Sequence, residues 1–248
     1  MKNFHKLSAA ATLALILGTT PSSANNAFFK SGLTAGGDIG YSKMMGRFTN
    51  DSQKTTTAGV VTFITSSATH KNFNASSIIG SIFGGYRHIT ESGFAIGFNI
   101  GVSIDGSSVK DSGKINTVTF STKLNRQFQI TPALFIGQRI AERWMIFTEL
   151  GLSVSRFKLK STRTLNNITA SHNKSFTKVG FAPAIGTEYA INKNLAVMGK
   201  LTYEIFGSTK KDVGSTTRTV GITTNKTAND VKVKPHYFTA KVGMLYKF

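Results

Sequence analysis

Residues 93–104 read GFAIGFNIGVSI, and this stretch decides the fold. Every second residue in it is large and apolar, namely Phe94, Ile96, Phe98, Ile100, Val102 and Ile104. The residues between them are small or polar, namely Ala95, Gly97, Asn99, Gly101 and Ser103. Successive side chains of a β-strand point to opposite faces. The stretch therefore predicts a strand with one apolar face and one face of small or polar groups.

The same period-two alternation recurs along the rest of the chain, and no segment shows a sustained helical stripe. Seven further strands are predicted, at 32–44, 76–87, 126–137, 144–156, 176–191, 195–206 and 236–248. Residues 76–87 fit least well, because Ile78-Ile79 and Ile82-Phe83 place apolar groups on both faces. The sequence thus predicts eight antiparallel strands, an even number.

The predicted connections alternate in length. Short ones fall at 88–92, 140–143 and 191–194, and long ones at 45–75, 105–116, 157–175 and 208–235. This alternation is typical of a transmembrane β-barrel of the bacterial outer membrane, with short periplasmic turns and long extracellular loops. Residues 59–65 and 217–224 are themselves strand-like, which allows hairpins to continue above the membrane.

The size of the side chains indicates which face meets lipid. A soluble barrel would bury its apolar face, but eight strands leave an interior only wide enough for side chains. The small residues and a few long charged ones suit such an interior, whereas the bulky set would crowd it. Aromatic residues also gather toward strand ends, as in the interfacial girdles of membrane barrels. They are Tyr41, Tyr86, Trp144, Tyr189, Tyr203, Tyr246 and Phe248.

Several charged residues lie in phase with the small side chains. They are Glu149, Lys178, Glu188, Lys200, Glu204 and Lys241. A low-dielectric lumen holds such charges only in pairs, so we expect a lumen charge network, with Glu204 near Lys241 and Glu188 near Lys200. The alternative is ordinary solvated surface charge, which suits Lys247 and Glu142 better.

The first residues do not fit the barrel pattern. Lys2 and Lys6 precede an apolar stretch at 7–17, and small residues at Ser22 and Ala24 precede the polar Asn25. This order is typical of a secretory signal peptide. We predict a cleaved signal peptide at 1–24 and a barrel domain at 25–248. Export then places the chain in the cell outer membrane.

The chain is strongly basic, with a formal net charge of +19, and it has no cysteine. Basic residues gather in the third and fourth long connections, at Arg156, Lys158, Lys160, Arg163, Lys174, Lys210, Lys211 and Arg218. A positive excess attracts polyanions, so we expect contacts with lipopolysaccharide phosphates or acidic host glycans. A solvated face that keeps the loops extended is an equal alternative. Nucleic acid is disfavoured, because few aromatic residues lie between the charges to stack on bases.

The sequence carries few residues arranged for catalysis or metal binding. The histidines His70, His88, His172 and His236 have no metal-binding spacing, so neither a metal site nor a cofactor is expected. Ser171-His172 is the nearest approach to a nucleophile beside a base. Plain loop composition explains that pair more simply, and no catalytic residue is predicted.

The last strand, HYFTAKVGMLYKF, resembles the C-terminal signature of bacterial outer-membrane proteins. The matching residues are Val242, Met244, Tyr246 and Phe248, and the resemblance implies recognition by the barrel assembly machinery. Residues 25–248 as a whole are similar to small eight-stranded barrels of the outer-membrane protein A transmembrane type and to porin-like surface antigens.

The resemblance and the residues together predict a non-enzymatic surface barrel. Its expected roles are membrane integrity and adhesin-like or antigenic exposure of basic loops. A narrow porin-like diffusion channel is the first alternative, and the lumen charges argue against it. A hydrolase at the outer rim is the second alternative.

Overall fold

The computed structural model describes residues 28–58, 61–115, 118–165, 168–220 and 223–248. Side chains are described except at the outer ends of the hairpins, at 50–54, 61, 63–69, 113–120, 163–170, 211–220 and 223–231. The predicted signal peptide at 1–24 therefore lies outside the described residues and stays a prediction.

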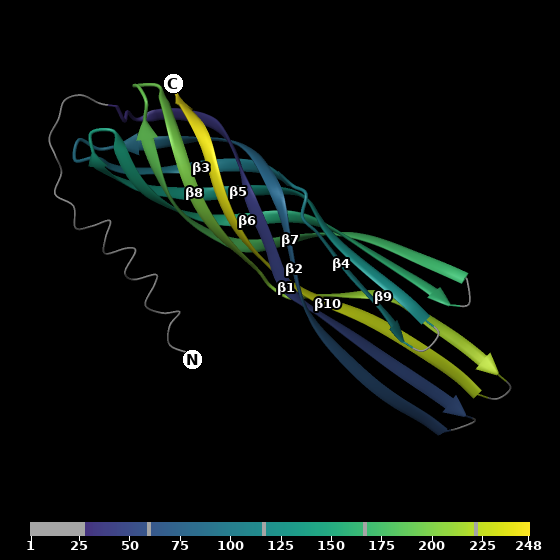
Figure 1. Ribbon diagram of the computed structural model, residues 1–248. Coiled ribbons are helices and arrows are strands. Elements are labelled where there is room, and N and C mark those ends of the chain that lie inside the picture. Colours follow the sequence, from purple (N-terminus) through teal and green to yellow (C-terminus); the bar gives the residue numbers. More distant parts are fainter. Residues whose placement is uncertain (1–27, 59–60, 116–117, 166–167, 221–222) are drawn as a thin grey trace.

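Within these ranges the regular structure is all β. The strands are β1 (Gly32–Ala58), β2 (Val61–Ile89), β3 (Phe94–Asp105), β4 (Ser108–Ile115), β5 (Val118–Ala141), β6 (Trp144–Leu165), β7 (Ile168–Ala190), β8 (Leu195–Phe206), β9 (Thr209–Val220) and β10 (Thr223–Lys247). Eight of them form an antiparallel ring in the order β1–β2–β3–β5–β6–β7–β8–β10, which closes where β10 pairs with β1 (Figure 1). The predicted eight-stranded barrel is confirmed.

Beyond the ring, the segments predicted as long loops continue as β-hairpins. They separate into two groups that diverge from the barrel (Figure 1). In the first hairpin sheet the neighbouring strands are, in order, β4, β5, β6 and β7. In the second hairpin sheet β2, β1, β10 and β9 are neighbours. An ion pair between Lys71 of β2 and Asp111 of β4 joins the two sheets.

The outer wall of the ring is apolar, as the alternation predicts. Phe98 is 54% exposed whereas its neighbour Asn99 is 5% exposed, and Ile78 and Ile82 are each 71% exposed. A soluble monomer rarely carries so large a continuous apolar surface. The band of bulky side chains therefore faces acyl chains. No helix in the described ranges is long and apolar enough to span a membrane.

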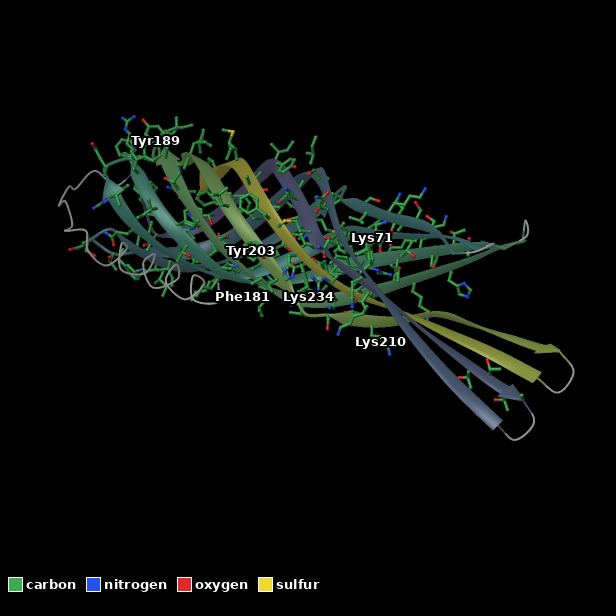
Figure 2. The ribbon with its side chains drawn as sticks, turned by 60° about the horizontal axis from the view of Figure 1, so that its bottom comes forward. Lys71, Phe181, Tyr189, Tyr203, Lys210 and Lys234 are labelled. Carbon is green, nitrogen blue, oxygen red and sulfur yellow. The ribbon has the colours of Figure 1, made fainter. Side chains whose placement is uncertain are left out.

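Aromatic side chains mark both borders of this band. Trp144 and Tyr189 contact each other near the short turns, with ring centroids 5.0 Å apart. Tyr41 and Tyr203 are exposed toward the hairpin sheets. Figure 2 shows Tyr189 near the short turns, whereas Lys71 and Lys210 lie on the hairpin side of the ring. The borders separate the periplasmic turns from the extracellular hairpins.

Candidate functional site

The upper lumen is organised around one buried arginine. The guanidinium of Arg126 is fully buried and forms ion pairs with Asp105 and Glu204, the second at 2.8 Å from Nη1 to Oε2. Ser42 Oγ donates to Asp105 at 3.0 Å, and Ser153 Oγ donates to Glu204 at 2.9 Å. Two carboxylates and one guanidinium thus share a satisfied hydrogen-bond network, as a charge in a low-dielectric interior requires.

Two lysine–carboxylate pairs occupy the middle of the lumen. Lys200 Nζ lies 3.0 Å from Glu149 Oε2, and Asn99 donates to the other carboxylate oxygen at 2.7 Å. Lys241 Nζ lies 3.3 Å from Asp38 Oδ1. These pairs link β1, β6, β8 and β10 across the inside of the barrel.

A further ion pair lies toward the short turns. Arg87 and Glu188 are both almost fully buried and bonded to each other. Lys247, which the sequence placed among solvated surface charges, is only 4% exposed. Its ammonium lies 3.9 Å from the ring centroid of Phe29. The surface assignment of Lys247 is wrong, because Phe28 and Phe29 fold across this end of the lumen and cover it.

Five of the six residues predicted for the lumen lie there: Glu149, Glu188, Lys200, Glu204 and Lys241. Lys178 is half-buried at the outer rim and donates to the carbonyl of Gly207. Glu188 pairs with Arg87 rather than Lys200, and Glu204 pairs with Arg126 rather than Lys241.

Arg87, Arg126 and Asp105 were missed, whereas Asp38 lies in phase with the small residues of its predicted strand, which allowed a lumenal position. A β-bulge between Arg126 and Phe128 explains one case. Strict alternation puts both residues on the lipid face, but the extra residue of a bulge reverses the direction of a side chain. Arg87 lies at the end of the strand whose pattern was poorest. Each is a solitary arginine beside the apolar residues of a predicted strand, and that feature could have indicated the lumen position of Arg87 and of Arg126.

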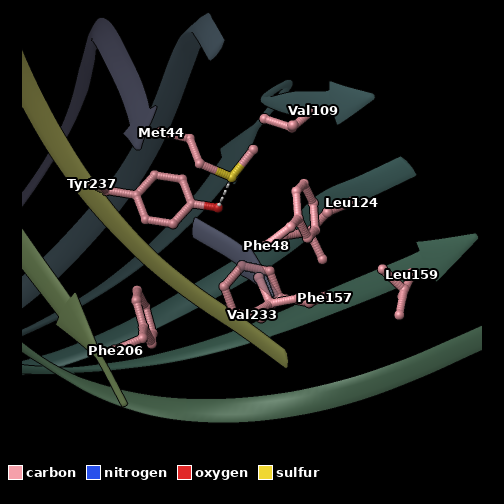
Figure 3. Packing of buried hydrophobic residues seen from close by; sticks show 9 residues of the cluster. All are labelled: Met44, Phe48, Val109, Leu124, Phe157, Leu159, Phe206, Val233 and Tyr237. Carbon is pink, nitrogen blue, oxygen red and sulfur yellow. Dashed lines mark hydrogen bonds between the residues drawn. The ribbon is translucent and has the colours of Figure 1, made fainter. Parts of the chain in front are cut away.

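Large apolar side chains close both ends of the charged region. Toward the hairpins, one cluster fills the barrel mouth (Figure 3), comprising Met44, Phe48, Val109, Leu124, Phe157, Leu159, Phe206, Val233 and Tyr237. Tyr237 donates its hydroxyl to Met44 Sδ at 2.8 Å. Toward the turns, a second cluster comprises Phe29, Ala95, Phe135, Met145, Phe147 and Ala190. We call these the outer and inner apolar layers.

Each apolar layer is capped by an arginine of the lumen network. The guanidinium carbon of Arg126 lies 3.8 Å from the ring centroid of Tyr237, and that of Arg87 lies 3.9 Å from that of Phe135. Cation–π contacts of this kind are strongest when desolvated. Between the layers the lumen holds a small cavity of about 40 Å³, lined by ion-paired side chains that include Glu149, Lys200 and Lys241. The barrel is therefore filled and has no aqueous channel in the described region.

Outside the barrel, three lysines stand in one row on the first hairpin sheet. Lys110 of β4 is the register partner of Lys123 of β5, and Lys123 is the partner of Lys160 of β6. All three are exposed, as are Lys158 and Arg156 further down β6. We call these five residues the first cationic face. Arg156 is the first outward residue above the membrane band, two positions beyond Val154.

The other predicted basic residues are placed differently. Lys174 pairs in register with the buried Leu159, so it lies on the opposite face of the sheet from Lys160. Lys210 is exposed on β9 of the second hairpin sheet. The side chains of Arg163, Lys211 and Arg218 lie outside the described residues.

The predicted assembly signal lies on the lipid face of β10. Val242, Met244, Tyr246 and Phe248 are 61%, 52%, 47% and 72% exposed. Phe248 also donates its backbone N–H to the carbonyl of Leu33 at 3.0 Å, which extends the β1–β10 seam.

No catalytic constellation is found in the described residues. His172 is exposed on β7, opposite Ser161 of β6, and no described carboxylate pairs with it. Among the described side chains, no group of three His, Asp or Glu residues could hold a metal ion.

The geometry defines a small transmembrane β-barrel with a filled lumen. The outer membrane protein beta-barrel domain family matches residues 10–248. The chain therefore belongs to that family and is an outer-membrane protein of the Gram-negative type. No curated protein matches it significantly.

Solved barrels resemble the chain at low identity. The outer-membrane protease OmpT from Escherichia coli is 9% identical over 87% of this chain and 97% of its own, with a TM-score of 0.49. OprG from Pseudomonas aeruginosa is 15% identical over 89% and 98%, with a TM-score of 0.46. Neisserial surface protein A is 14% identical over 82% and 97%, with a TM-score of 0.37.

Proposed function

We propose that this protein is a non-enzymatic surface barrel whose first cationic face binds phosphates of lipopolysaccharide in the outer leaflet. The row Lys110–Lys123–Lys160 carries the proposal. Directly opposed residues of antiparallel strands have Cβ atoms about 4.5–5.5 Å apart, and like charges at that distance are destabilising. Such a row costs stability unless an anion neutralises it.

The position of the row points to the membrane surface. Leu152 is 52% exposed within the lipid band, and the next outward residues of β6 beyond Val154 are Arg156, Lys158 and Lys160. No described carboxylate pairs with these three cations. Phosphates of a neighbouring glycolipid would meet them at this height. Bridging of phosphates by cations would strengthen the outer leaflet, which is the membrane-integrity role.

An acidic glycan of a host surface offers the same chemistry from solution. It is the second candidate ligand, because the outer part of the first cationic face, at Lys110, Lys123 and Lys160, is exposed to solvent as well. A diffusion channel is disfavoured by the two apolar layers and by the ion pairs between them.

The test compares lipopolysaccharide and heparin binding to the detergent-solubilised protein at two salt concentrations. Lys123→Gln/Lys160→Gln should weaken lipopolysaccharide binding roughly tenfold or more, since hydrogen bonds to charged groups contribute about 1.5–3 kcal/mol each. Lys30→Gln/Lys193→Gln removes the same charge on the turn side and should bind as the wild type does. Equal affinity of all three proteins at low salt would reject the proposal. Loss of heparin binding alone would instead assign the face to glycans in solution.

The hydrolase alternative has its own test. The wild type and His172→Ala should both leave lipid and peptide substrates intact. Cleavage by the wild type that His172→Ala abolishes would replace the surface-barrel proposal with the rim-hydrolase one.

We also propose that the assembly machinery recognises the outward residues of β10. Deleting Phe248 should reduce the folded, heat-modifiable form in outer membranes, whereas Val231→Ala outside the motif should not. Equal amounts of folded barrel in both variants would remove this proposal.

A further inference from the structure

A second cationic face lies on the outside of the second hairpin sheet. The outward residues of β10 are apolar from Phe248 up to Phe238, and the next three are His236, Lys234 and Lys232. Lys234 is labelled in Figure 2. Outward positions of a strand are about 6.6–6.8 Å apart. The outward side chains of β10 therefore change from apolar to basic between Phe238 and His236, directly above the acyl chains.

Neighbouring strands complete this face. Arg47 of β1 is the register partner of Lys234, so two cations stand directly opposite each other. Arg47 Nε donates to Asn72 of β2 at 3.2 Å, which holds the guanidinium against the sheet. His70 of β2 lies one row further out, bonded through Nδ1 to Thr49 at 3.1 Å. Three strands, β10, β1 and β2, thus contribute to one surface.

These residues line an open cleft of about 760 Å³. Its charged and imidazole groups are Arg47, His70, Lys232, Lys234 and His236, and Thr49, Asn72 and Ser208 add neutral polar groups. Within the described part of the chain, no carboxylate lies within ion-pair distance of Arg47, Lys232 or Lys234. A recess that carries three cations and two imidazoles, and no described carboxylate, complements an anion with several oxygens, such as a sugar phosphate.

The central pairs of the two faces, Arg47–Lys234 on β1 and β10 and Lys123–Lys160 on β5 and β6, are on opposite sides of the ring. Two strands, β2 and β3, separate β1 from β5, and two others, β7 and β8, separate β6 from β10. Outward positions in between carry neutral groups, such as Ser76 and Asn74 on β2 and Ser175 and Thr177 on β7. The positive charge is therefore divided into two separate surfaces.

We propose that this cleft is a second phosphate-binding site, occupied by the phosphorylated sugar headgroup of an outer-leaflet glycolipid, so that one barrel holds two such lipids on opposite sides. The proposal rests on the proposed function of the first cationic face. The lipid source is favoured because Phe238 and Tyr203, both exposed to acyl chains, lie immediately below His236. A lipid bound there would place its headgroup in the cleft and its chains on this apolar wall.

The experiment counts bound lipids by native mass spectrometry of the detergent-solubilised protein with purified diphosphoryl lipid A. The wild type should bind two. Arg47→Gln/Lys234→Gln should bind one, with the second site weakened roughly tenfold or more. Lys123→Gln/Lys160→Gln should also bind one, and the four-fold variant none. Lys30→Gln/Lys193→Gln is the matched control and should bind two. All variants replace exposed side chains, and heat-modifiability checks that each is folded.

The outcomes separate the two proposals. One lipid on the wild type, lost in Lys123→Gln/Lys160→Gln and kept in Arg47→Gln/Lys234→Gln, would overturn the second site and leave the proposed function standing. No lipid on the wild type would overturn both. Glucosamine phosphate that binds the cleft as tightly as lipid A does would assign the cleft to soluble sugar phosphates and overturn the lipid assignment.

Discussion

Arg126 is the residue on which the upper lumen depends. Its guanidinium is shared by Asp105 and Glu204, and all three side chains are buried. Removing one member of such a group leaves uncompensated buried charge, which typically costs about 3–5 kcal/mol. We therefore expect Arg126→Met to lower the free energy of unfolding by about that amount.

Urea unfolding from lipid vesicles can measure this loss, with the fluorescence of Trp144, the single tryptophan, as the signal. Arg126→Met/Asp105→Asn/Glu204→Gln removes all the charges together and should recover most of the stability. If the triple variant is no more stable than Arg126→Met, the charge explanation fails and lost packing against Tyr237 is the cause.

His236 reports on the second cationic face. Burial and, after it, the charge of Lys234 lower the pKa of the His236 imidazole from its ordinary value. The other groups facing it are Tyr203, whose ring stacks at 6.3 Å, and the nearby Arg47 of the cleft. A neighbouring like charge disfavours the protonated form, and an anion favours it.

Two shifts in the pKa of His236 are therefore expected, both upward. Lys234→Gln should raise it by removing the like charge, and lipid A bound to the wild type should raise it by adding an opposite one. Titration of the imidazole resonances by NMR measures both, with His88 on the turn side as the internal control. A pKa that stays constant when lipid A is added would place the lipid elsewhere.

At the scale of elements, the strand extensions show a conflict between stability and binding. In the row Lys110–Lys123–Lys160, Lys123→Glu converts two repulsive cross-strand pairs into attractive ones. Each such pair contributes roughly 0.2–1 kcal/mol. Amides of the β5–β6 extension should exchange hydrogen more slowly in the variant, while binding to lipopolysaccharide weakens.

Slower hydrogen exchange together with weaker lipopolysaccharide binding would show that the row is kept for binding at the expense of stability. Lys193→Glu at a periplasmic turn changes the net charge equally and should alter neither. Slower exchange with unchanged binding would mean that the row has no ligand.

Strand positions could be predicted from the sequence, because alternation is imposed by the membrane. Lipid tolerates only apolar side chains on the outer wall, so the signal repeats on every strand. The hairpin extensions were harder to predict, because they lie outside the lipid. Without lipid on one face, the alternation of apolar and polar side chains fades. The extension at 108–115 reads SVKDSGKI, with few apolar residues to mark a strand.

Lumen composition was only partly predictable. The carboxylates and lysines in phase with small residues were visible, but Arg126 was hidden by the bulge after it. The apolar layers were not expected, although Phe135, Phe147 and Phe157 occupy lumen positions. Aromatic residues at those positions are read as strand formers, and only the closed ring shows that they meet.

At the scale of the whole molecule, the barrel is a filled cylinder. Two apolar layers enclose five carboxylates and their cations around a cavity of about 40 Å³. An ion would have to displace aromatic packing and break ion pairs to cross, so no steady conductance is expected.

Planar bilayer recordings of the purified protein measure this directly. The wild type should show no channels at applied voltages that leave the bilayer intact, and a known porin reconstituted in the same way is the positive control. Stable openings in the nanosiemens range would mean that the apolar layers and ion pairs do not fill the lumen in the membrane.

The β1–β10 seam has a consequence for synthesis. Register partners run from Thr34 and Lys247 up to Ala58 and Thr223, so the first strand made waits for the last. Until β10 is in place, the edge of β1 that does not pair with β2 exposes unpaired backbone groups, and such edges template association with other chains. A chain cut short before residue 223 lacks β10 and cannot close the ring. We therefore expect truncated chains of this protein to associate with other chains rather than to accumulate as folded barrels.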